Sequence, residues 1–533
     1  MIYIVDFGSQ VTQLIARRVR EAGVYCEIVG SQNLLLKIRK NIPSGIIFSG
    51  GPASVHKSKT PKIDKKVFDL GIPILGICYG MQLITHQLGG KVQMSKQREF
   101  GKTAININSK SVLFEGLRKK NNQYNVWMSH GDKVIKLPKG FKRLASSVNS
   151  KYVAIENNNL NFYGLQFHPE VVHTDQGEKI INNFIFKICR SRPNWNMQNY
   201  LKNQLSSIKD KVGKDHVICG LSGGVDSMVT ASIISKSINK QLTCIYVDTG
   251  LMRYNETKEV VSLFKSHFKS KLIVVDAKNK FFNALRNISD PEKKRKIIGN
   301  MFIKIFNQEA KKISKAKFLA QGTIYPDVIE SQSFHGGPTS VIKSHHNVGG
   351  LPKSMKLRLV EPLRELFKDE VRKLGVKLKL PKSFIQRHPF PGPGLGIRIL
   401  SDITKDKVLM LQKADKIYID EIKSAGLYNE IWQAFAVLLP VKTVGVMGDQ
   451  RSYEFVCGLR AVTSVDGMTA DFYPFSGEFL SKVSTRIINE VKGINRVVYD
   501  TTSKPPGTIA VSYTHLRAHE TRGNLVCRLL GEK

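Results

Sequence analysis

A glycine-rich loop between a strand and a helix constrains the fold of the middle of the chain more than any other feature. Residues 216–221 (HVICGL) form a short apolar run, the loop at 221–227 is LSGGVDS, and residues 227–237 have an apolar helical pattern. A second strand-like run at 242–247 follows after a short loop. This order predicts a βαβ unit with parallel strands.

The same loop is suited to binding phosphate. Its glycines allow close approach of the main chain, and Ser222 and Ser227 add hydroxyl donors at a helix N-terminus, where anionic oxygens bind. A lone Ser-Gly-Gly also fits a tight strand–helix turn, but the full context favours phosphate. The loop lacks the lysine that serves γ-phosphoryl transfer in the common phosphate loop. Asp226 either helps to hold Mg²⁺ between phosphates or caps the helix.

The N-terminal segment predicts a second parallel α/β sheet. Strand-like runs at 1–5, 45–48 and 72–76 alternate with helical patterns such as 10–22. Cys78 (GICYG) follows the third run and precedes an apolar helix, which is the setting of a nucleophile elbow. The helix N-terminus favours the thiolate of such a cysteine.

A base and an oxyanion site are predicted at other strand ends of this segment. His168 in QFHPE could take the thiol proton, and Glu170 could orient the imidazole. Residues 49–52 (SGGP) offer main-chain N–H groups for an oxyanion. A single cysteine or histidine is often only a buried core residue. Three strand-end elements in one α/β segment favour catalysis.

Residues 1–190 therefore resemble class I glutamine amidotransferases. The resemblance implies that Cys78, His168 and Glu170 hydrolyse glutamine through a thioester and release ammonia. It also implies oxyanion and glutamine-binding roles for Gly50, Gly51, Tyr79 and Gln82, with Gly51 and Tyr79 as the oxyanion donors and Gln82 beside the glutamine.

The LSGGVDS loop resembles the pyrophosphate loop of N-type ATP pyrophosphatases, which cleave ATP between the α- and β-phosphates and adenylate an oxygen. Further strings extend the likeness, so that residues 1–509 resemble the glutamine-hydrolysing GMP synthetases. These strings are VDTGL (247–251), RKIIG (295–299), QGTIYPD (321–327), KSHHN (343–347), RHPFPGPG (387–394) and SKPPG (503–507).

This family resemblance implies an ATP-dependent amination in purine biosynthesis. ATP adenylates the C2 oxygen of xanthosine 5′-monophosphate (XMP), ammonia attacks C2, and AMP leaves as GMP forms. ATP with Mg²⁺ is a substrate, and no bound organic cofactor is expected. The implied ATP-binding residues are Ser222, Gly223, Gly224, Val225, Asp226, Ser227, Met228, Val247 and Asp248.

Cationic residues are candidates for the XMP phosphate and for a lid. Arg295 and Lys504 suit a phosphate dianion, although each also fits a solvated surface charge. Lys343, His345 and His346, together with the Pro/Gly-dense residues 387–396, resemble parts that close over the intermediate.

The expected fold class is α/β: two doubly wound parallel-sheet domains followed by a smaller α+β dimerisation domain, which implies a homodimer. The expected bounds are an amidotransferase at 1–192, an ATP pyrophosphatase at 193–388 and a dimerisation domain at 389–509. Residues 510–533 form an aberrant tail.

The tail departs from the family pattern. The family ends with Thr-Ile-Glu-Trp-Glu, whereas Thr508-Ile509 is followed here by AVSYTHLRAHETRGNLVCRLLGEK. SYTHLRAHET resembles translated adapter sequence, so we interpret residues 510–533 as a sequencing or gene-model artefact. The alternative is a genuine basic extension that binds a partner.

The amino-acid composition limits which binding partners and which cellular compartment we expect for the protein. Lys+Arg 82 against Asp+Glu 43 gives a net charge of +39, but the excess is spread along the chain. We ascribe it to an AT-rich genome rather than to a nucleic-acid surface, and expect no nucleic-acid partner. The seven cysteines show no metal or disulfide spacing, and no apolar run suits a membrane. Without a recognisable leader, the expected location is cytoplasmic.

Three other functions fit part of the sequence. A tRNA thiolase would suit the charge but leave the predicted glutaminase triad unexplained. NAD synthetases share the loop but usually obtain ammonia from a nitrilase-type domain. A non-catalytic nucleotide-sensing scaffold would need a broken triad or loop, and both are intact.

Overall fold

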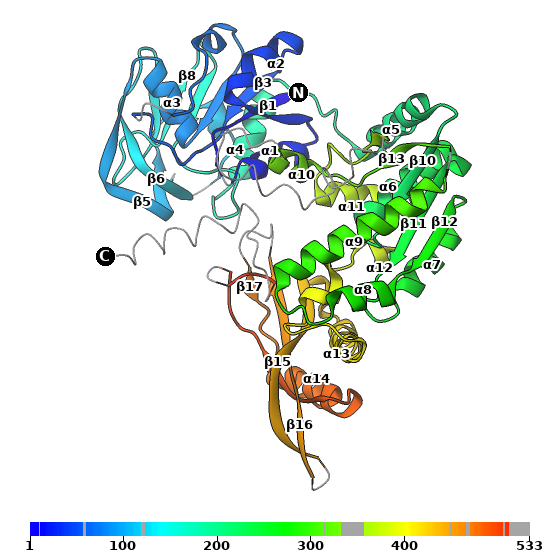
Figure 1. The fold of residues 1–533 in the computed structure, drawn as a ribbon. Helices are drawn as coiled ribbons and strands as arrows, with labels where there is room; N and C mark the ends of the chain where they lie inside the picture. The colour runs from blue at the N-terminus through cyan, green and yellow to red at the C-terminus, as the bar shows by residue number, and fades with distance from the viewer. Residues whose placement is uncertain are drawn as a thin grey trace. The chain divides into compact units, whose positions relative to one another are not determined.

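The computed structural model describes residues 1–510 except residues 10, 57–59, 119–122, 314, 332–356, 448–449, 465–469 and 505–506. Side chains at 96–98, 330–331, 383, 447 and 450 are also outside the description. The chain forms two compact units, unit 1 from Met1 to Asn199 and unit 2 from Tyr200 onward (Figure 1). The predicted lid residues Lys343, His345 and His346 lie outside the described residues.

Unit 1 contains a nine-stranded sheet in the order β2-β1-β3-β4-β9-β8-β7-β5-β6. Its strands are β1 (Ile2–Asp6), β2 (Cys26–Gly30), β3 (Gly45–Phe48), β4 (Ile74–Ile77), β5 (Lys91–Ile107), β6 (Gln123–Lys136), β7 (Lys142–Ser147), β8 (Ala154–Asn157) and β9 (Phe162–Leu165). Its helices are α1 (Thr12–Glu21), α2 (Leu34–Lys40), α3 (Tyr79–Gln87) and α4 (Gly177–Asn182), which continues as a π-helical stretch, Asn183–Ile188.

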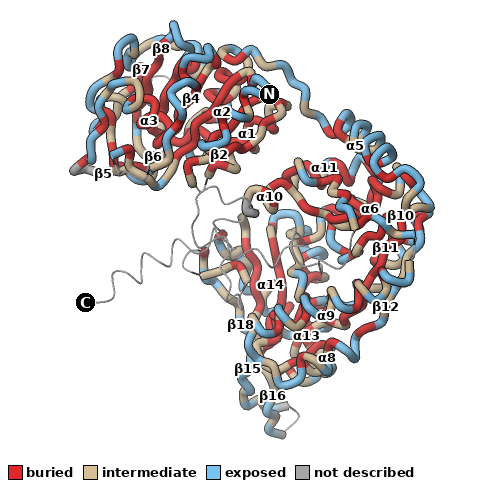
Figure 2. Tube along the Cα trace, turned by 45° about the horizontal axis from the view of Figure 1, so that its top comes forward, coloured by how far each residue is buried: buried red, intermediate tan, exposed pale blue. Residues whose placement is uncertain are grey.

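The sheet of unit 1 has two halves. The pairs from β2 to β9 are parallel, and their strands are almost wholly apolar because both faces are buried (Figure 2). The pairs from β9 to β6 are antiparallel. The predicted strand–helix alternation is confirmed for the parallel half. The antiparallel half, which was not predicted, adds further strands to the same sheet.

The first part of unit 2 is a five-stranded parallel sheet in the order β12-β11-β10-β13-β14. Its elements are α5 (Met197–Val212, which begins before Tyr200), β10 (His216–Gly220), α6 (Val225–Ile238), β11 (Leu242–Asp248), α7 (Glu256–His267), β12 (Lys271–Asp276), α8 (Lys278–Leu285), α9 (Pro291–Lys311), β13 (Ala316–Ala320), α10 (Tyr325–Ser331), β14 (Arg358–Val360), α11 (Lys368–Lys377) and α12 (Lys382–Ile385). Chain order reverses between β10 and β13, so their carboxyl ends mark the topological switch point where ligands of such sheets bind.

The second part of unit 2 is a mainly antiparallel sheet with two helices. Its elements are α13 (Lys405–Ser424), β15 (Gln433–Met447), β16 (Gln450–Thr463), β17 (Asp471–Phe472), α14 (Gly477–Glu490) and β18 (Ile494–Tyr499). One hydrophobic cluster runs from Ile218 and Ile245 through Ile298 to Leu411 and Leu459, so the two parts share a core.

The architecture is α/β, as predicted. At the end of the Pro/Gly-dense residues 387–396, a short 3₁₀ helix spans Gly394–Ile397. Across the described stretches, no helix is both long and apolar enough to cross a membrane.

Candidate active sites

Cys78 stands on a strained turn between β4 and α3. Its φ of 52° and ψ of −106° are rare for a residue with a side chain. Its N–H donates to the carbonyl of Leu165 in β9 at 2.6 Å. A Cβ at Gly80 would lie 2.5 Å from the Phe48 carbonyl oxygen, and one at Gly76 would lie 2.6 Å from the carbonyl carbon of Gly80. The turn therefore requires both glycines, as a nucleophile elbow does.

His168 and Glu170, just after β9, lie at the same end of the sheet as Cys78. His168 Nδ1 is 2.7 Å from Glu170 Oε1, and both side chains are buried. A Cβ at Gly50 would lie 3.0 Å from His168 Cε1 and 3.6 Å from Cys78 Cβ. The structure thus brings together the three predicted catalytic residues, with Gly50 packed between His168 and Cys78.

The electrostatics of His168 favour its charged form. Burial alone would lower the His168 pKa, but the Glu170 carboxylate and hydrogen bonds to Cys78 and Glu170 outweigh it. The pKa of His168 is therefore held well above its ordinary value. Such an imidazole can keep the proton of Cys78 and stabilise the thiolate beside it.

The predicted oxyanion donors are the main-chain N–H groups of Gly51 and Tyr79, and the predicted neighbour of the glutamine is Gln82. The N–H groups of Gly51 and Tyr79 donate no hydrogen bond to any other residue that the structure describes. The Gln82 amide donates to the Asp132 carbonyl at 2.9 Å and to Gln166 Oε1 at 3.3 Å. Gln166 in turn places its Nε2 3.8 Å from Cys78 Sγ. Gln82 therefore belongs to the same buried polar cluster as the nucleophile.

In unit 2 the LSGGVDS loop connects β10 to α6. Gly223 has a φ of +81°, which favours glycine, and Gly224 is the N-cap of the helix. Ser227 Oγ accepts from the Ser222 N–H at 3.3 Å and donates to the Gly224 carbonyl at 2.9 Å. The two serines thus shape the loop, while the side chains of the other predicted members Val225 and Met228 are buried.

Val247 and Asp248 end β11, the parallel neighbour of β10, and therefore share the carboxyl edge with the loop. Asp248 Oδ1 accepts from the Gly250 N–H at 2.9 Å, and its Oδ2 is 3.2 Å from Lys278 Nζ. The strand order thus brings together the predicted adenosine residues and the phosphate loop.

Sequence reasoning missed a cation beside the loop. Lys368, the first residue of α11, places its Nζ 2.6 and 2.5 Å from the two carboxylate oxygens of Asp226. Because 142 positions separate them, no local signal indicates the pair. The alternative that Asp226 caps the helix was wrong, since the N-cap is Gly224.

The fit of Mg²⁺ depends on Asp226. Within the described residues, no group of three or more His, Cys, Asp or Glu side chains could hold a metal ion. A single carboxylate is nevertheless the usual protein contribution when Mg²⁺ arrives on nucleotide phosphates. Asp226, in the first turn of α6 beside the loop, fits that limited role.

The two predicted XMP residues lie in different elements of unit 2. Arg295 is in α9, with its NH1 3.2 Å from Glu292 Oε2. Lys504 follows β18 and pairs its main chain with Ala470.

A buried arginine holds the segment that carries Lys504. Arg460 of β16 donates to the carbonyls of Thr502, Thr508 and Ile509, each at 2.9 Å. Its NH1 lies 2.8 Å from Asp500 Oδ2. One guanidinium therefore contacts the chain before Lys504, at Asp500 and Thr502, and after it, at Thr508 and Ile509.

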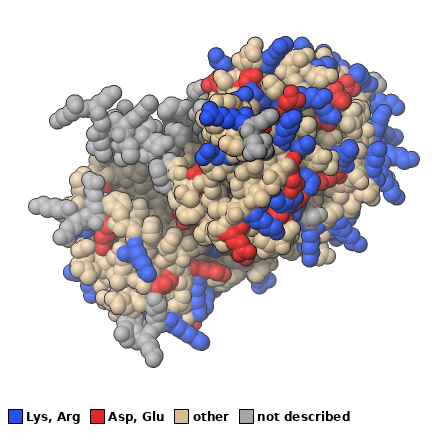
Figure 3. All heavy atoms as spheres, turned by 90° about the horizontal axis from the view of Figure 1, so that it is seen from below, with Lys and Arg blue, Asp and Glu red and all other residues tan. Residues whose placement is uncertain are grey.

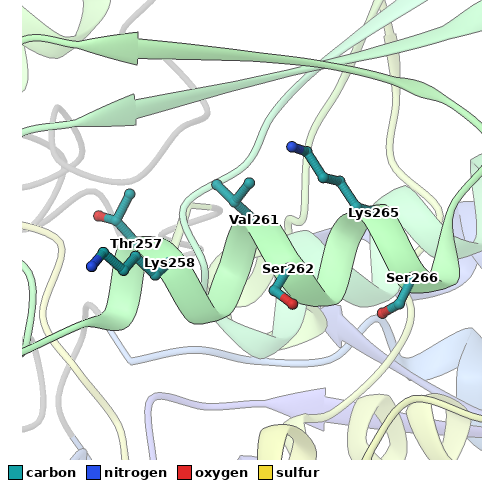
Figure 4. A pocket seen from close by; sticks show the side chains of 6 residues that line it. All are labelled: Thr257, Lys258, Val261, Ser262, Lys265 and Ser266. Carbon is teal, nitrogen blue, oxygen red and sulfur yellow. The ribbon is translucent and has the colours of Figure 1, made fainter.

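A surface hollow of about 660 Å³ is lined by residues of α7. It follows one side of α7 (Figure 4). Its lining contains no predicted site residue and consists of Thr257, Lys258, Val261, Ser262, Lys265 and Ser266.

Comparisons with known proteins cover nearly the whole chain. Family models match at residues 3–188 (glutamine amidotransferase class-I), 197–304 (NAD synthase) and 420–511 (GMP synthase C terminal domain). The chain is 59% identical over 508 residues to a glutamine-hydrolysing GMP synthase of Bartonella henselae, covering 95% of this chain and 98% of that protein. A Rhizobium rhizogenes protein of the same name matches with the same identity and coverage.

Removing the charge of Glu170 should slow the reaction of Cys78 with an alkylating reagent. In Glu170→Gln the His168 pKa falls, so the thiolate loses its charged partner. We expect iodoacetamide to modify Cys78 about tenfold more slowly near pH 7, which corresponds to about 1.4 kcal/mol. Mass spectrometry of the Cys78 peptide across pH measures the rate. The control Glu115→Gln breaks an exposed ion pair with Lys187, and equal rates in both variants would contradict the prediction.

Proposed function

The chain belongs to the family of glutamine-hydrolysing GMP synthases, and we propose how its residues divide the work. It is a ligase that forms a C–N bond with glutamine as amide donor. Ammonia from glutamine aminates XMP at the expense of ATP, giving GMP, AMP, diphosphate and glutamate. The observation that carries the proposal is that one chain holds a cysteine–histidine–glutamate site and a strand-end phosphate loop.

Cys78, His168 and Glu170 hydrolyse glutamine. The Cys78 sulfur attacks the carboxamide carbon, and His168 accepts the thiol proton and donates it to the departing ammonia. The N–H groups of Gly51 and Tyr79 stabilise the oxyanion, and Gln82 contacts the glutamine beside Gly50. Water then hydrolyses the thioester to glutamate. The buried His168–Glu170 pair supports this assignment because it holds the imidazole in one orientation.

The loop of residues 222–228 binds the ATP phosphates, and Val247 and Asp248 bind the adenosine. Asp226 would hold the Mg²⁺ that accompanies ATP, and the ion would supply positive charge against the phosphates. The C2 oxygen of XMP attacks the α-phosphorus and diphosphate leaves. Adenylation is needed because this carbonyl-like oxygen is a poor leaving group, and AMP departs when ammonia attacks C2. Lys368, beside Asp226, contacts the phosphates of ATP.

Arg295 and Lys504 bind the XMP phosphate as cationic donors. Lys343, His345 and His346 act as lid residues, as the family resemblance implies. The contacts of Arg460 with Thr502, Thr508 and Ile509 support the assignment of Lys504, because they hold main-chain carbonyls on both sides of this lysine.

Replacement of Cys78 should separate the two half-reactions. In Cys78→Ala we expect glutamine-driven GMP formation to fall at least a thousandfold, since the nucleophile is lost, while ammonium-driven formation persists. The assay incubates ATP, Mg²⁺ and XMP with glutamine or ammonium and quantifies GMP and AMP. Asp226→Asn changes the proposed ATP site instead, so it should reduce GMP formation with both glutamine and ammonium. If neither wild type nor the protein with the repaired C-terminus described below forms GMP from either nitrogen source, the choice of XMP as substrate is wrong.

The domain bounds that we propose are 1–192, 193–388 and 389–509, with residues 510–533 as an artefact of the sequence. The match to the curated relatives spans 508 residues, which accommodates the first three segments. Ala510 stands where the family pattern has glutamate.

Repair of the C-terminus should improve XMP use. A protein with Ala510→Glu, Val511→Trp and Ser512→Glu that ends there should have a KM for XMP lowered about tenfold, because the segment that carries Lys504 regains its family ending. The KM for glutamine serves as the internal control. Detection of peptides from 511–533 in the natural protein by mass spectrometry would reject the artefact proposal.

We propose a homodimer formed through the C-terminal part of unit 2. Cross-strand neighbours Val444 and Tyr453 are 51% and 61% exposed, and Val446 on the same face is 74% exposed. Such an apolar strip is typical of a self-complementary interface.

Charge in the strip should break the dimer. We expect wild type to show twice the chain mass by light scattering, and Val444→Glu the mass of one chain, since two buried carboxylates would face apolar surface. Val376→Glu, at a similarly exposed position of α11 (53%), should leave the mass unchanged. A dimeric Val444→Glu would place the interface elsewhere.

We also propose a cytoplasmic enzyme without a nucleic-acid partner. Six cysteines of the described chain are free thiols, which suits a reducing compartment. On the face shown in Figure 3, Lys and Arg side chains are interspersed with Asp and Glu rather than gathered in one patch.

A further inference from the structure

A short segment of β6, Ser129–Asp132, borders the glutaminase site through its main chain. The Ser129 carbonyl oxygen is 3.6 Å from Cys78 Sγ. The Asp132 carbonyl accepts the Gln82 amide at 2.9 Å. One carbonyl therefore faces the nucleophile, and the other fixes the orientation of Gln82. The position of this segment decides the geometry of both residues.

Two buried ionisable side chains hold this segment in place: His130, which belongs to it, and Glu99 of the neighbouring strand β5. His130 Nδ1 is 3.0 Å from the Asp132 carbonyl oxygen, and its Nε2 is 3.1 Å from Glu99 Oε2. Glu99 Oε1 accepts from Ser147 Oγ of β7 at 2.9 Å. The side chains of His130 and Glu99 are only 2% and 4% exposed. This chain of contacts links three strands to the carbonyl that orients Gln82.

The pair lies at an irregularity of the sheet. Pairing between β5 and β6 shifts register between Met94 and Glu99 and resumes with Glu99 opposite His130. A register shift leaves main-chain groups without ladder partners, so side chains must fix the local course. His130 does so for the Asp132 carbonyl.

Burying two ionisable groups is costly, and well-packed apolar residues would often be at least as stable. Burial raises the Glu99 pKa, but interaction with His130, the Ser147 hydrogen bond and the charge of Lys133 outweigh it, so this pKa lies below its ordinary value. A charged carboxylate is thus kept inside the sheet. Stability alone does not explain why this ionisable pair is buried. A need to fix the positions of the Ser129 and Asp132 carbonyls does explain it.

We propose that Glu99 and His130 are positioning residues for glutamine hydrolysis. They hold the Ser129–Asp132 main chain so that Gln82 meets the substrate amide and the Ser129 carbonyl keeps its place beside Cys78. Neither side chain touches the reacting atoms. The proposal rests on the proposed glutamine site, and a misplacement of about 1 Å there can cost about a hundredfold in rate.

The test compares two nitrogen sources in the full-length enzyme. In Glu99→Gln and His130→Asn we expect kcat/KM for glutamine to fall about 10- to 100-fold, mainly through a higher KM. Ammonium-driven GMP formation should equal that of wild type, since it needs only unit 2. The double variant should lose no more than the worse single variant, because the residues act as one unit.

Matched variants separate positioning from a general loss of folding. Glu27→Gln breaks a partly exposed ion pair with Lys37 in the same unit and should leave the glutamine KM unchanged. Ser147→Ala removes only the hydrogen bond to Glu99 Oε1 and should shift the KM in the same direction by a smaller factor.

Two results would overturn the proposal: an unchanged glutamine KM in Glu99→Gln and His130→Asn, or a parallel loss with both nitrogen sources. Cys78→Ala tests the underlying assignment separately. Glutamine-driven activity in that protein would refute the site itself rather than the role of the pair.

Discussion

The glutaminase site depends on how closely main chains approach one another at the carboxyl ends of β3, β4 and β9. A side chain at Gly80 would collide with the Phe48 carbonyl, and a Cβ at Gly50 would lie only 3.0 Å from His168 Cε1. A side chain at Gly80 would therefore force a shift of the main chain at the end of β3, and one at Gly50 would displace the His168 ring that contacts Cys78. The strain at Cys78 persists because packing on every side determines it. The arrangement of the proposed catalytic residues therefore depends on glycines at positions where a Cβ atom would not fit.

The same physics recurs at the nucleotide edge of unit 2. A Cβ at Gly394 would lie 2.2 Å from the Leu251 carbonyl oxygen, which accepts the Leu395 N–H at 2.8 Å. The Pro/Gly segment is thus pressed onto the turn that follows Asp248. Arg253 extends the contact, with its Nε 3.3 Å from Asp415 of α13. A displacement of the proposed adenosine residues Val247 and Asp248 would therefore strain the core shared with the C-terminal part.

Local pattern was sufficient for the features that depend on a strand, a turn and a helix. The Cys78 elbow, the LSGGVDS loop and their flanking elements were predictable because each signal lies within about twenty residues. Contacts between residues that are distant in the sequence could not be predicted. Lys368, Arg460 and Glu99 each contact residues far from them along the chain. The antiparallel half of the first sheet was also missed, although β6 alternates buried and more exposed side chains, and register shifts interrupt its pairing with β5. The roles of Arg295 and Lys504 remain predictions.

The Lys368–Asp226 pair bears on how a loop without lysine handles a charged nucleotide. Their side chains are 44% and 30% exposed, and exposed ion pairs contribute only about 0–1 kcal/mol. If Asp226 holds Mg²⁺ as we propose, exchange of the ammonium for the metal ion would cost little and would leave Lys368 available to the proposed phosphate site. In the common phosphate loop, the lysine belongs to the loop and has a fixed reach. Here it comes from α11, which packs against α6, so the cation is placed by tertiary packing and not by loop sequence. A substitution that shifts α11 should therefore weaken ATP binding while the LSGGVDS sequence remains intact.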